Sequence, residues 1–117
     1  MKVKELAEEL NLRVFEPGEN MDRIISGGYS SDLLSDVMGH SVQDQVWITL
    51  QNHLNIVAVA SLKDLAAIIL VHGQEPSEEV LARAMEEGIT LLGTESDTFS
   101  TSARVYISLH RNGPDQR

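Results

Sequence analysis

One stretch constrains the fold more than any other, residues 53–73, which read HLNIVAVASLKDLAAIILVHG. It holds two apolar runs, at residues 56–60 and 66–71, with the short polar insert 61–64 between them. Each run is short, rich in aliphatic side chains and bounded by polar residues, so a strand is favoured over a helix. Neither run alternates with polar residues, so both faces of each strand need cover. This pattern is typical of a parallel or mixed sheet between helical layers.

Composition narrows the class of protein. The chain has 117 residues, of which 42% are hydrophobic and 23% charged, as expected for one globular domain. Its net charge of −9 disfavours nucleic acid and membrane surfaces as partners. Cysteine is absent, which excludes disulfides and thiolate metal sites. The N-terminus lacks the apolar core of a signal peptide, and no apolar run is long enough to cross a membrane, so we predict a cytoplasmic protein.

Several segments have the apolar spacing of amphipathic helices. Residues 2–10 and 76–88 show it most clearly, and a further helix is expected over residues 33–39. The last helix is predicted to begin at a capping residue, Ser96 or Asp97. Its expected core face consists of Phe99, Ala103, Tyr106 and Ile107.

The remaining apolar segments predict further strands, at residues 13–15, 23–26, 46–50 and 89–92. The order of strands and helices predicts an α/β protein: a three-layer α/β/α sandwich with a mostly parallel or mixed central sheet of about five strands. We expect a single domain over residues 1–110 and a disordered tail over residues 111–117. Trp47 is expected in the core or at a subunit interface.

The most suggestive local motif is Ser26-Gly27-Gly28-Tyr29-Ser30, followed by Ser31 and Asp32. A strand that runs into two glycines and then a capped helix would leave backbone N–H groups free to hold a phosphate or carboxylate. The motif is neither a dinucleotide fingerprint nor a phosphate-binding P-loop. A tight turn with close packing explains the glycines equally well.

The histidines do not predict a metal site. His40, His53, His72 and His110 lack the short, face-matched spacing of metal ligands. Structural or surface roles are therefore favoured, and we predict neither a metal ion nor a cofactor. His53 and His72 are each expected to flank a central strand, at the sheet edges.

A second polar cluster, residues 97–102, follows a predicted strand at the start of the last helix. Capping explains Asp97 or Ser96 alone, but four hydroxyls and a carboxylate could together line a ligand site. Thr49, at the end of another strand, could face the same side. No activated nucleophile or pair of carboxylates stands out, so we predict no enzymatic activity.

Taken in order, these strings resemble the DRTGG domain family. The resemblance covers about residues 12–109 and is carried by residues 27–38, 46–50, 53–60, 67–70, 76–88 and 97–101. The family's namesake string is absent, and Val71-His72-Gly73 stands where a glycine-bearing turn is expected. DRTGG domains are regulatory modules beside CBS domains in some pyrophosphatases and in some phosphotransacetylases. They are similar to the N-terminal domain of HPr kinase/phosphorylase.

The resemblance implies a non-catalytic, often dimeric, regulatory domain. We expect it to stand alone, to form a homodimer and to bind a small anion or nucleotide. The candidate ligand-binding residues are Ser26, Gly27, Gly28, Tyr29, Ser30, Thr49, Asn55, His72, Asp97 and Thr98. Two alternatives stay open: a small phosphotransfer or acyl-transfer enzyme, and a scaffold that binds a protein partner but no small molecule.

Overall fold

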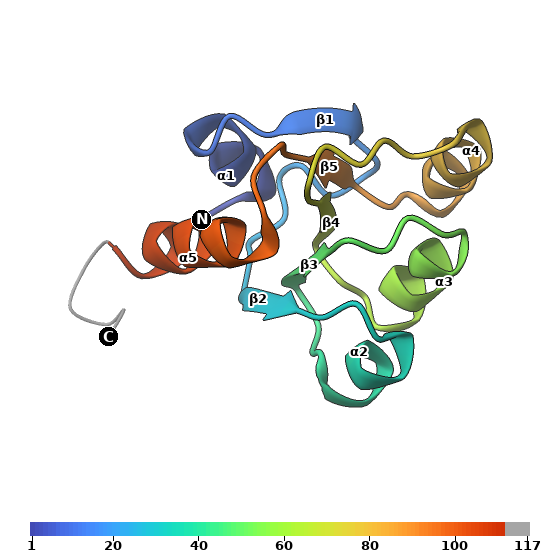
Figure 1. Ribbon diagram of the computed structural model, residues 1–117, viewed down its shortest axis with the longest axis horizontal. Coiled ribbons are helices and arrows are strands. Elements are labelled where there is room, and N and C mark those ends of the chain that lie inside the picture. Colours follow the sequence, from blue (N-terminus) through green and yellow to red (C-terminus); the bar gives the residue numbers. More distant parts are fainter. Residues whose placement is uncertain (112–117) are drawn as a thin grey trace.

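The computed structural model describes residues 1–111 and has three layers, a five-stranded sheet between two groups of helices (Figure 1). The strands are β1 (Arg13–Glu16), β2 (Gly27–Ser30), β3 (Gln45–Thr49), β4 (Ala67–Leu70) and β5 (Leu91–Gly93). The helices are α1 (Val3–Glu9), α2 (Leu34–His40), α3 (Asn55–Leu62), α4 (Glu78–Glu87) and α5 (Thr98–His110). The predicted α/β/α sandwich is confirmed. The predicted tail falls almost wholly on residues 112–117, outside the described residues.

The sheet is mixed, with strand order β1-β5-β4-β3-β2. Four strands, β2 to β5, run parallel, and β1 pairs antiparallel with β5 at one edge. Helices α2, α3 and α4 cover one face of the sheet, and α1 and α5 cover the other (Figure 1). Each helix of the first group connects two parallel strands, which need such a crossover.

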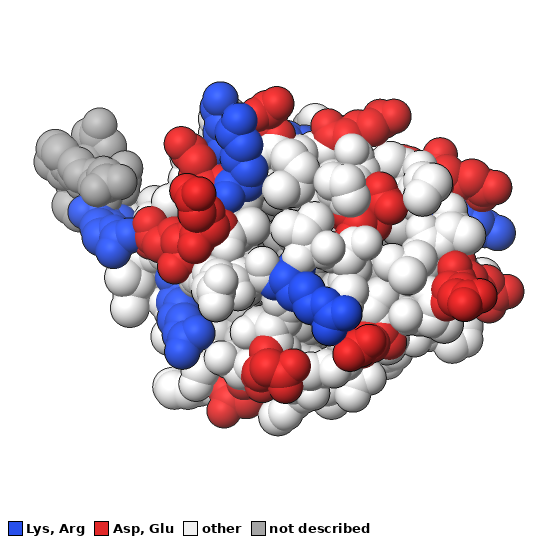
Figure 2. Space-filling model, turned by 90° about the horizontal axis from the view of Figure 1, so that it is seen from above, with Lys and Arg blue, Asp and Glu red and all other residues white. Residues whose placement is uncertain are grey.

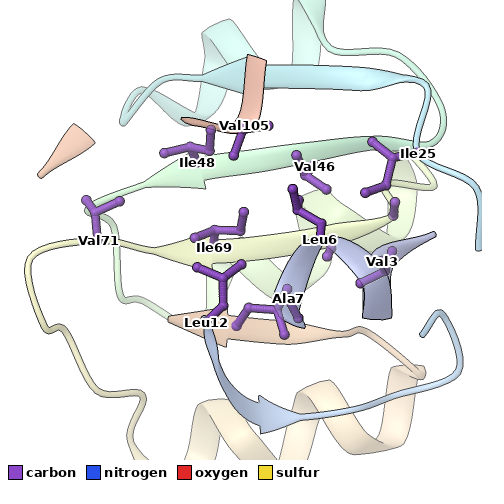
Figure 3. Close-up of a cluster of buried hydrophobic side chains, with 13 residues drawn as sticks. Val3, Leu6, Ala7, Leu12, Ile25, Val46, Ile48, Ile69, Val71 and Val105 are labelled. Carbon is purple, nitrogen blue, oxygen red and sulfur yellow. The ribbon is translucent and has the colours of Figure 1, made fainter. Parts of the chain in front are cut away.

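Each face of the sheet has its own apolar core. Beneath α1 and α5, side chains such as Leu6, Val46, Ile69 and Val105 pack together (Figure 3). Beneath α2, α3 and α4, Trp47 packs with side chains of β4 and α3 and is fully buried. Trp47 was predicted to lie in the core or at a subunit interface, and the core is therefore correct. The run at residues 66–71 is the central strand β4, as predicted.

The prediction of a strand at residues 56–60 is wrong, because these residues form the helix α3. Four of its residues are buried: Ile56, Val57, Val59 and Ala60. The exposed side of this helix also carries apolar residues, Ala58 and Leu62, so the sequence shows no clear apolar stripe and resembles that of a buried strand. Chain connectivity decides between them, since β3 and β4 are parallel neighbours and require a crossover here.

The predicted strand at residues 23–26 is also misplaced. Ile24 makes only an isolated bridge with Lys2, and the strand β2 begins at Gly27. Gly27 and Gly28 thus lie inside the strand rather than in a strand-to-helix turn. A Cβ on Gly28 would stand 3.6 Å from Val105 Cγ1, so this glycine faces α5. This distance is an ordinary van der Waals contact, so α5 packs on β2 at this position without requiring glycine.

The predicted core face of α5 is wrong as well. Phe99, Tyr106 and Ile107 are exposed, with 84% of the Phe99 surface accessible to solvent. The buried residues of this helix are Thr101, Val105 and Ser108. Two of its serines bond to neighbouring elements: Ser102 Oγ lies 2.7 Å from Ser30 Oγ, and Ser108 Oγ donates to Glu9. Polar contacts therefore orient α5, and its apolar stripe faces outward.

The other helices lie close to their predicted positions. Ser77 caps α4 by accepting from Val80 N, and Gly88 ends the helix in the left-handed conformation. Asp97 caps α5 in the same way. Helix α2 runs one residue past Gly39, and only Val37 of its predicted face is buried.

Candidate ligand-binding site

The carboxyl ends of the parallel strands meet at one edge of the sheet. From there the chain enters α4 after β4 and α5 after β5, on opposite faces of the sheet (Figure 1). The two connecting segments, residues 71–77 and 94–97, therefore diverge. In open α/β sheets, ligands bind in the crevice that such a divergence opens. This edge is thus the first place to look for a site.

The two diverging segments are held together by backbone hydrogen bonds. His72 N donates to Ser96 O and Gly73 N donates to Thr94 O, both at 2.9 Å. His72 and Gly73 both have positive φ, of 59° and 68°. A Cβ at Gly73 would meet only the flexible carboxylate of Glu95, at 2.7 Å, so glycine is favoured there by its conformation and not by space. The turn after β4 is consequently specific in its shape.

A cavity of about 360 Å³ lies at this divergence. Its walls include the apolar side chains of Leu10 and Phe15 and the polar side chains of Arg13, Thr94, Glu95 and Arg104. Arg13 reaches this edge because β1 runs antiparallel, which sets Arg13 opposite Gly93 at the end of β5. Small-molecule sites typically measure about 300–1,000 Å³ and combine apolar walls with a few polar groups. The cavity fits this description.

Arg104 is the group in this cavity best suited to bind an anion. Within residues 1–111, no carboxylate oxygen lies within 4.0 Å of its guanidinium, whereas each of the other described arginines has such a partner. Arg13, for example, pairs with Glu75 at 3.2 Å. Basic side chains are scattered among acidic ones on the face that Figure 2 shows. In an acidic chain, an arginine without a carboxylate partner beside a cavity can form bidentate bonds to a phosphate or carboxylate.

Asp97 is the N-cap residue of α5, the helix that carries Arg104. Its Oδ1 accepts from Ser100 N at 2.7 Å, and this backbone hydrogen bond lowers the pKa of the carboxyl group. The charges of His72 and Arg104 lower it further, to a lesser extent. Asp97 is therefore a carboxylate at neutral pH, and one of its oxygens caps α5.

The structure brings five of the predicted residues to the carboxyl edge: Ser30, Thr49, His72, Asp97 and Thr98. Thr49 is fully buried and donates to Asp32 Oδ1 at 2.9 Å, so its hydroxyl supports the loop after β2. Asn55 follows the same edge as the first residue of α3. His53 and His72, at opposite ends of the stretch 53–73, were each expected to flank a central strand at the sheet edges. They follow β3 and β4 and lie at this one edge, because the run at residues 56–60 is helical.

The rest of the predicted set lies elsewhere. Ser26 and Gly27 stand at the amino end of the sheet, where Ser26 Oγ donates to Gln43 O at 2.8 Å. Tyr29 donates its hydroxyl to Asp36 at 2.9 Å, and this bond raises the pKa of Tyr29. The bonds from Ser31 and Tyr29 lower the pKa of Asp36. These residues thus form a separate structural network, and a ligand role for them stays a prediction.

Sequence reasoning missed the residues that line the cavity, above all Asn11, Arg13 and Arg104. The sequence held one signal, an asparagine just after the first predicted helix, a position at which Asn often adopts positive φ. Asn11 does so in the structure. Nothing in the sequence indicated that Arg13 and Arg104, so far apart along the chain, would meet.

A family model for the DRTGG domain matches residues 5–107. The chain belongs to the DRTGG domain family. The resemblance predicted from the sequence is thus confirmed.

Among solved structures, this DRTGG domain is similar to the CBS and DRTGG domains of the regulatory region of Clostridium perfringens pyrophosphatase, crystallised with the activator diadenosine tetraphosphate. The TM-score is 0.67 at 15% sequence identity. The match covers 89% of this chain and 45% of that one, so the chain spans less than half of the region it resembles. At this identity the likeness shows the fold alone. No curated protein matches the chain significantly.

Among residues 1–111, no helix is both long and apolar enough to cross a membrane. The same residues contain no group of three or more His, Asp or Glu side chains that could hold a metal ion.

Proposed function

We propose that this DRTGG domain is a non-catalytic regulatory module that binds a small anion or nucleotide at the carboxyl edge of its sheet. The observation that carries the proposal is Arg104, which has no carboxylate within 4.0 Å among the described residues and lines the cavity where the segments after β4 and β5 diverge. Arg13, in the same cavity, adds a second guanidinium.

Nucleotides are the first ligand class to test. The regulatory region of similar fold from C. perfringens was crystallised with a nucleotide activator. A phosphate group suits a pair of guanidiniums, since arginine forms two parallel hydrogen bonds to its oxygens.

The same geometry favours binding over catalysis. His72 and Asp97 would be the candidate base and acid of an enzyme, but Asp97 already caps α5 through Ser100 N. His72 is exposed, and its backbone conformation serves the turn after β4. A nucleophile with a base within reach is the requirement for covalent phosphotransfer or acyl transfer, and no observation favours that alternative here.

Isothermal titration calorimetry with ADP and inorganic pyrophosphate tests the proposal. We expect Arg104→Gln to weaken binding at least about tenfold, because it removes a charge-assisted contact. The matched control is Arg83→Gln, since Arg83 lies on the other helical layer and pairs with Glu86 at 3.4 Å. Absence of binding by the unmodified protein, or equal binding by both variants, would contradict the proposal.

We further propose that the domain forms a homodimer. The exposed apolar side chains of Phe99, Ala103 and Tyr106 form a stripe on the outer side of α5 that supports an interface, as does the edge strand β2. Light scattering at micromolar concentration should show a dimer, and a monomer alone would refute the dimer proposal.

The stripe equally favours the second candidate function, a scaffold for another protein. Calorimetry that detects no binding of either small molecule would support the scaffold. That the domain stands alone and acts in the cytoplasm stays a prediction.

A further inference from the structure

A second hollow, of about 340 Å³, lies beside the crevice cavity, between the end of α1 and the outer half of α5. Three residues line both hollows: Leu10, Asn11 and Arg104. The two hollows therefore adjoin, and Arg104 stands where they meet. A ligand with its charged group at Arg104 could extend into either one.

The two hollows differ in chemistry. The crevice cavity contains Arg13, Thr94 and Glu95 in addition to Arg104. The second hollow has apolar walls from Leu10 and Ile107, and 58% of the Ile107 surface is exposed. An exposed isoleucine in the wall of a hollow gains free energy when an apolar group covers it.

The far end of the second hollow is polar, but its charges are already paired. Glu9 accepts from Ser108 Oγ at 2.5 Å and pairs with Arg111. Arg104 is thus the one basic group of this hollow that has no carboxylate partner among residues 1–111. A ligand should accordingly place its anionic group at the junction and its apolar part between Leu10 and Ile107.

The crevice cavity offers no comparable surface for a ring. Phe15 is its only aromatic wall, and the Arg13 guanidinium already lies 4.7 Å from the centroid of that ring. At the ring edge, Phe15 Cε2 lies only 2.3 Å from where a Cβ on Gly93 would stand, so Phe15 packs closely on this glycine. The Phe15 ring is therefore already packed by Arg13 and Gly93, whereas Arg13 and Arg104 offer guanidinium groups for phosphates.

From this we infer that the DRTGG domain binds a nucleoside phosphate across both hollows. Its base packs between Leu10 and Ile107, and its phosphates lie at Arg104 and extend into the crevice toward Arg13. The inference rests on the proposed function, which concerns the anion alone, and adds the base-binding half of the site. It also assigns Ile107, on the outer face of α5, to ligand binding.

Calorimetry with ADP and pyrophosphate separates the two halves, because both probes carry a diphosphate and only ADP carries a base. Ile107→Ser should weaken ADP binding about tenfold, the effect of losing one buried aliphatic contact, and leave pyrophosphate binding unchanged. Phe99→Ser is the matched control: it removes an exposed apolar side chain from the same helix but does not line either hollow. It should change neither affinity.

The outcomes distinguish failure of the inference from failure of the proposed function. If pyrophosphate binds in an Arg104-dependent manner but ADP binds no more tightly, or if Ile107→Ser leaves ADP binding intact, the base-binding half is refuted and the anion site stands. If neither probe binds the unmodified protein, both proposals fail. Equal weakening of both probes by Ile107→Ser would also overturn the inference, since the side chain would then act on the phosphate site.

Discussion

The two helical layers of this protein differ in how they are held to the sheet. Helices α2, α3 and α4 pack over a continuous apolar core that contains Trp47. Helix α5, on the other face, buries Thr101 and Ser108 beside Val105 and is joined to its neighbours by hydroxyl hydrogen bonds. The α1–α5 layer also covers an apolar core, but α5 adds hydroxyl contacts that orient it and leaves Phe99, Tyr106 and Ile107 at the surface.

The layers also differ in their cavities. The hollows of about 360 and 340 Å³ both contain Arg104 of α5, which has no carboxylate partner among the described residues. A hollow of about 220 Å³ lies between α3 and α4, and its arginine, Arg83, is paired with Glu86. The α1–α5 layer therefore carries the groups available for binding, whereas the α2–α4 layer stabilises the sheet on which they stand.

The largest expected effect tests the support. Trp47 is fully buried, and its Nε1 donates to Ser31 O at 2.8 Å. Trp47→Ala should lower the free energy of unfolding by about 3–5 kcal/mol, as measured by urea denaturation. Phe99→Ala on the outer face of α5 should change the free energy of unfolding of the monomer by less than about 0.5 kcal/mol, because Phe99 is exposed there. A comparable loss for Phe99→Ala in the monomer would break the comparison.

A smaller effect tests the polar attachment of α5. Ser108 is buried, and its Oγ donates at 2.5 Å to the carboxylate of Glu9, the last residue of α1. Ser108→Ala should destabilise the protein by about 1 kcal/mol, the usual contribution of such a hydrogen bond. Ser61→Ala is the matched control in the α2–α4 layer, because Ser61 is exposed and its contact with Glu87 is long, at 3.5 Å. Equal unfolding midpoints for the two variants would show that hydroxyl contacts do not distinguish the layers.

The smallest expected effect concerns the titration of Asp97. The pKa of Asp97 is lowered chiefly by the hydrogen bond from Ser100 N. An NMR titration should therefore give this carboxyl group a pKa below that of an ordinary aspartate. Because the folded-state pKa is lowered, the stabilisation from this cap is present above the unfolded pKa of about 3.9 and is lost as pH falls through the folded value.

Arg104→Gln sharpens this test. It should raise the pKa of Asp97 only slightly, since the charge of Arg104 is a lesser cause. The pKa of Asp36, which bonds to Ser31 and Tyr29 in the other layer, should not change. An unchanged pKa of Asp97 would show that the charge of Arg104 does not act on this carboxyl group.

Prediction from sequence succeeded where a local signal agreed with the fold. Ser77 and Gly88 mark the ends of α4 because a side-chain cap and a left-handed glycine act within one turn of the chain. The order of the quoted strings likewise identified the family. The prediction failed for residues 56–60 and for the outer face of α5, where apolar spacing alone cannot tell which neighbours a segment will meet.

The candidate site shows a similar division. His72, Asp97 and Thr98 lie at the carboxyl edge, where residues that follow parallel strands gather, but none of them lines the cavity, so their ligand role stays a prediction. Arg13 and Arg104 line the cavity and were not predicted, since they join that edge only through the antiparallel pairing of β1 and the position of α5 over the opposite face.

By itself, then, the sequence determined the class of fold, the family, the caps of α4 and α5 and the central strand β4. These depend on apolar content, on side-chain hydrogen bonds within a few residues, and on the order of segments. Only the tertiary structure decided that residues 55–62 form a crossover helix, that β2 contains both glycines, and that Arg104 stands between two hollows. The physical reason is that burial and strand pairing depend on contacts between residues far apart in the chain, which local periodicity does not encode.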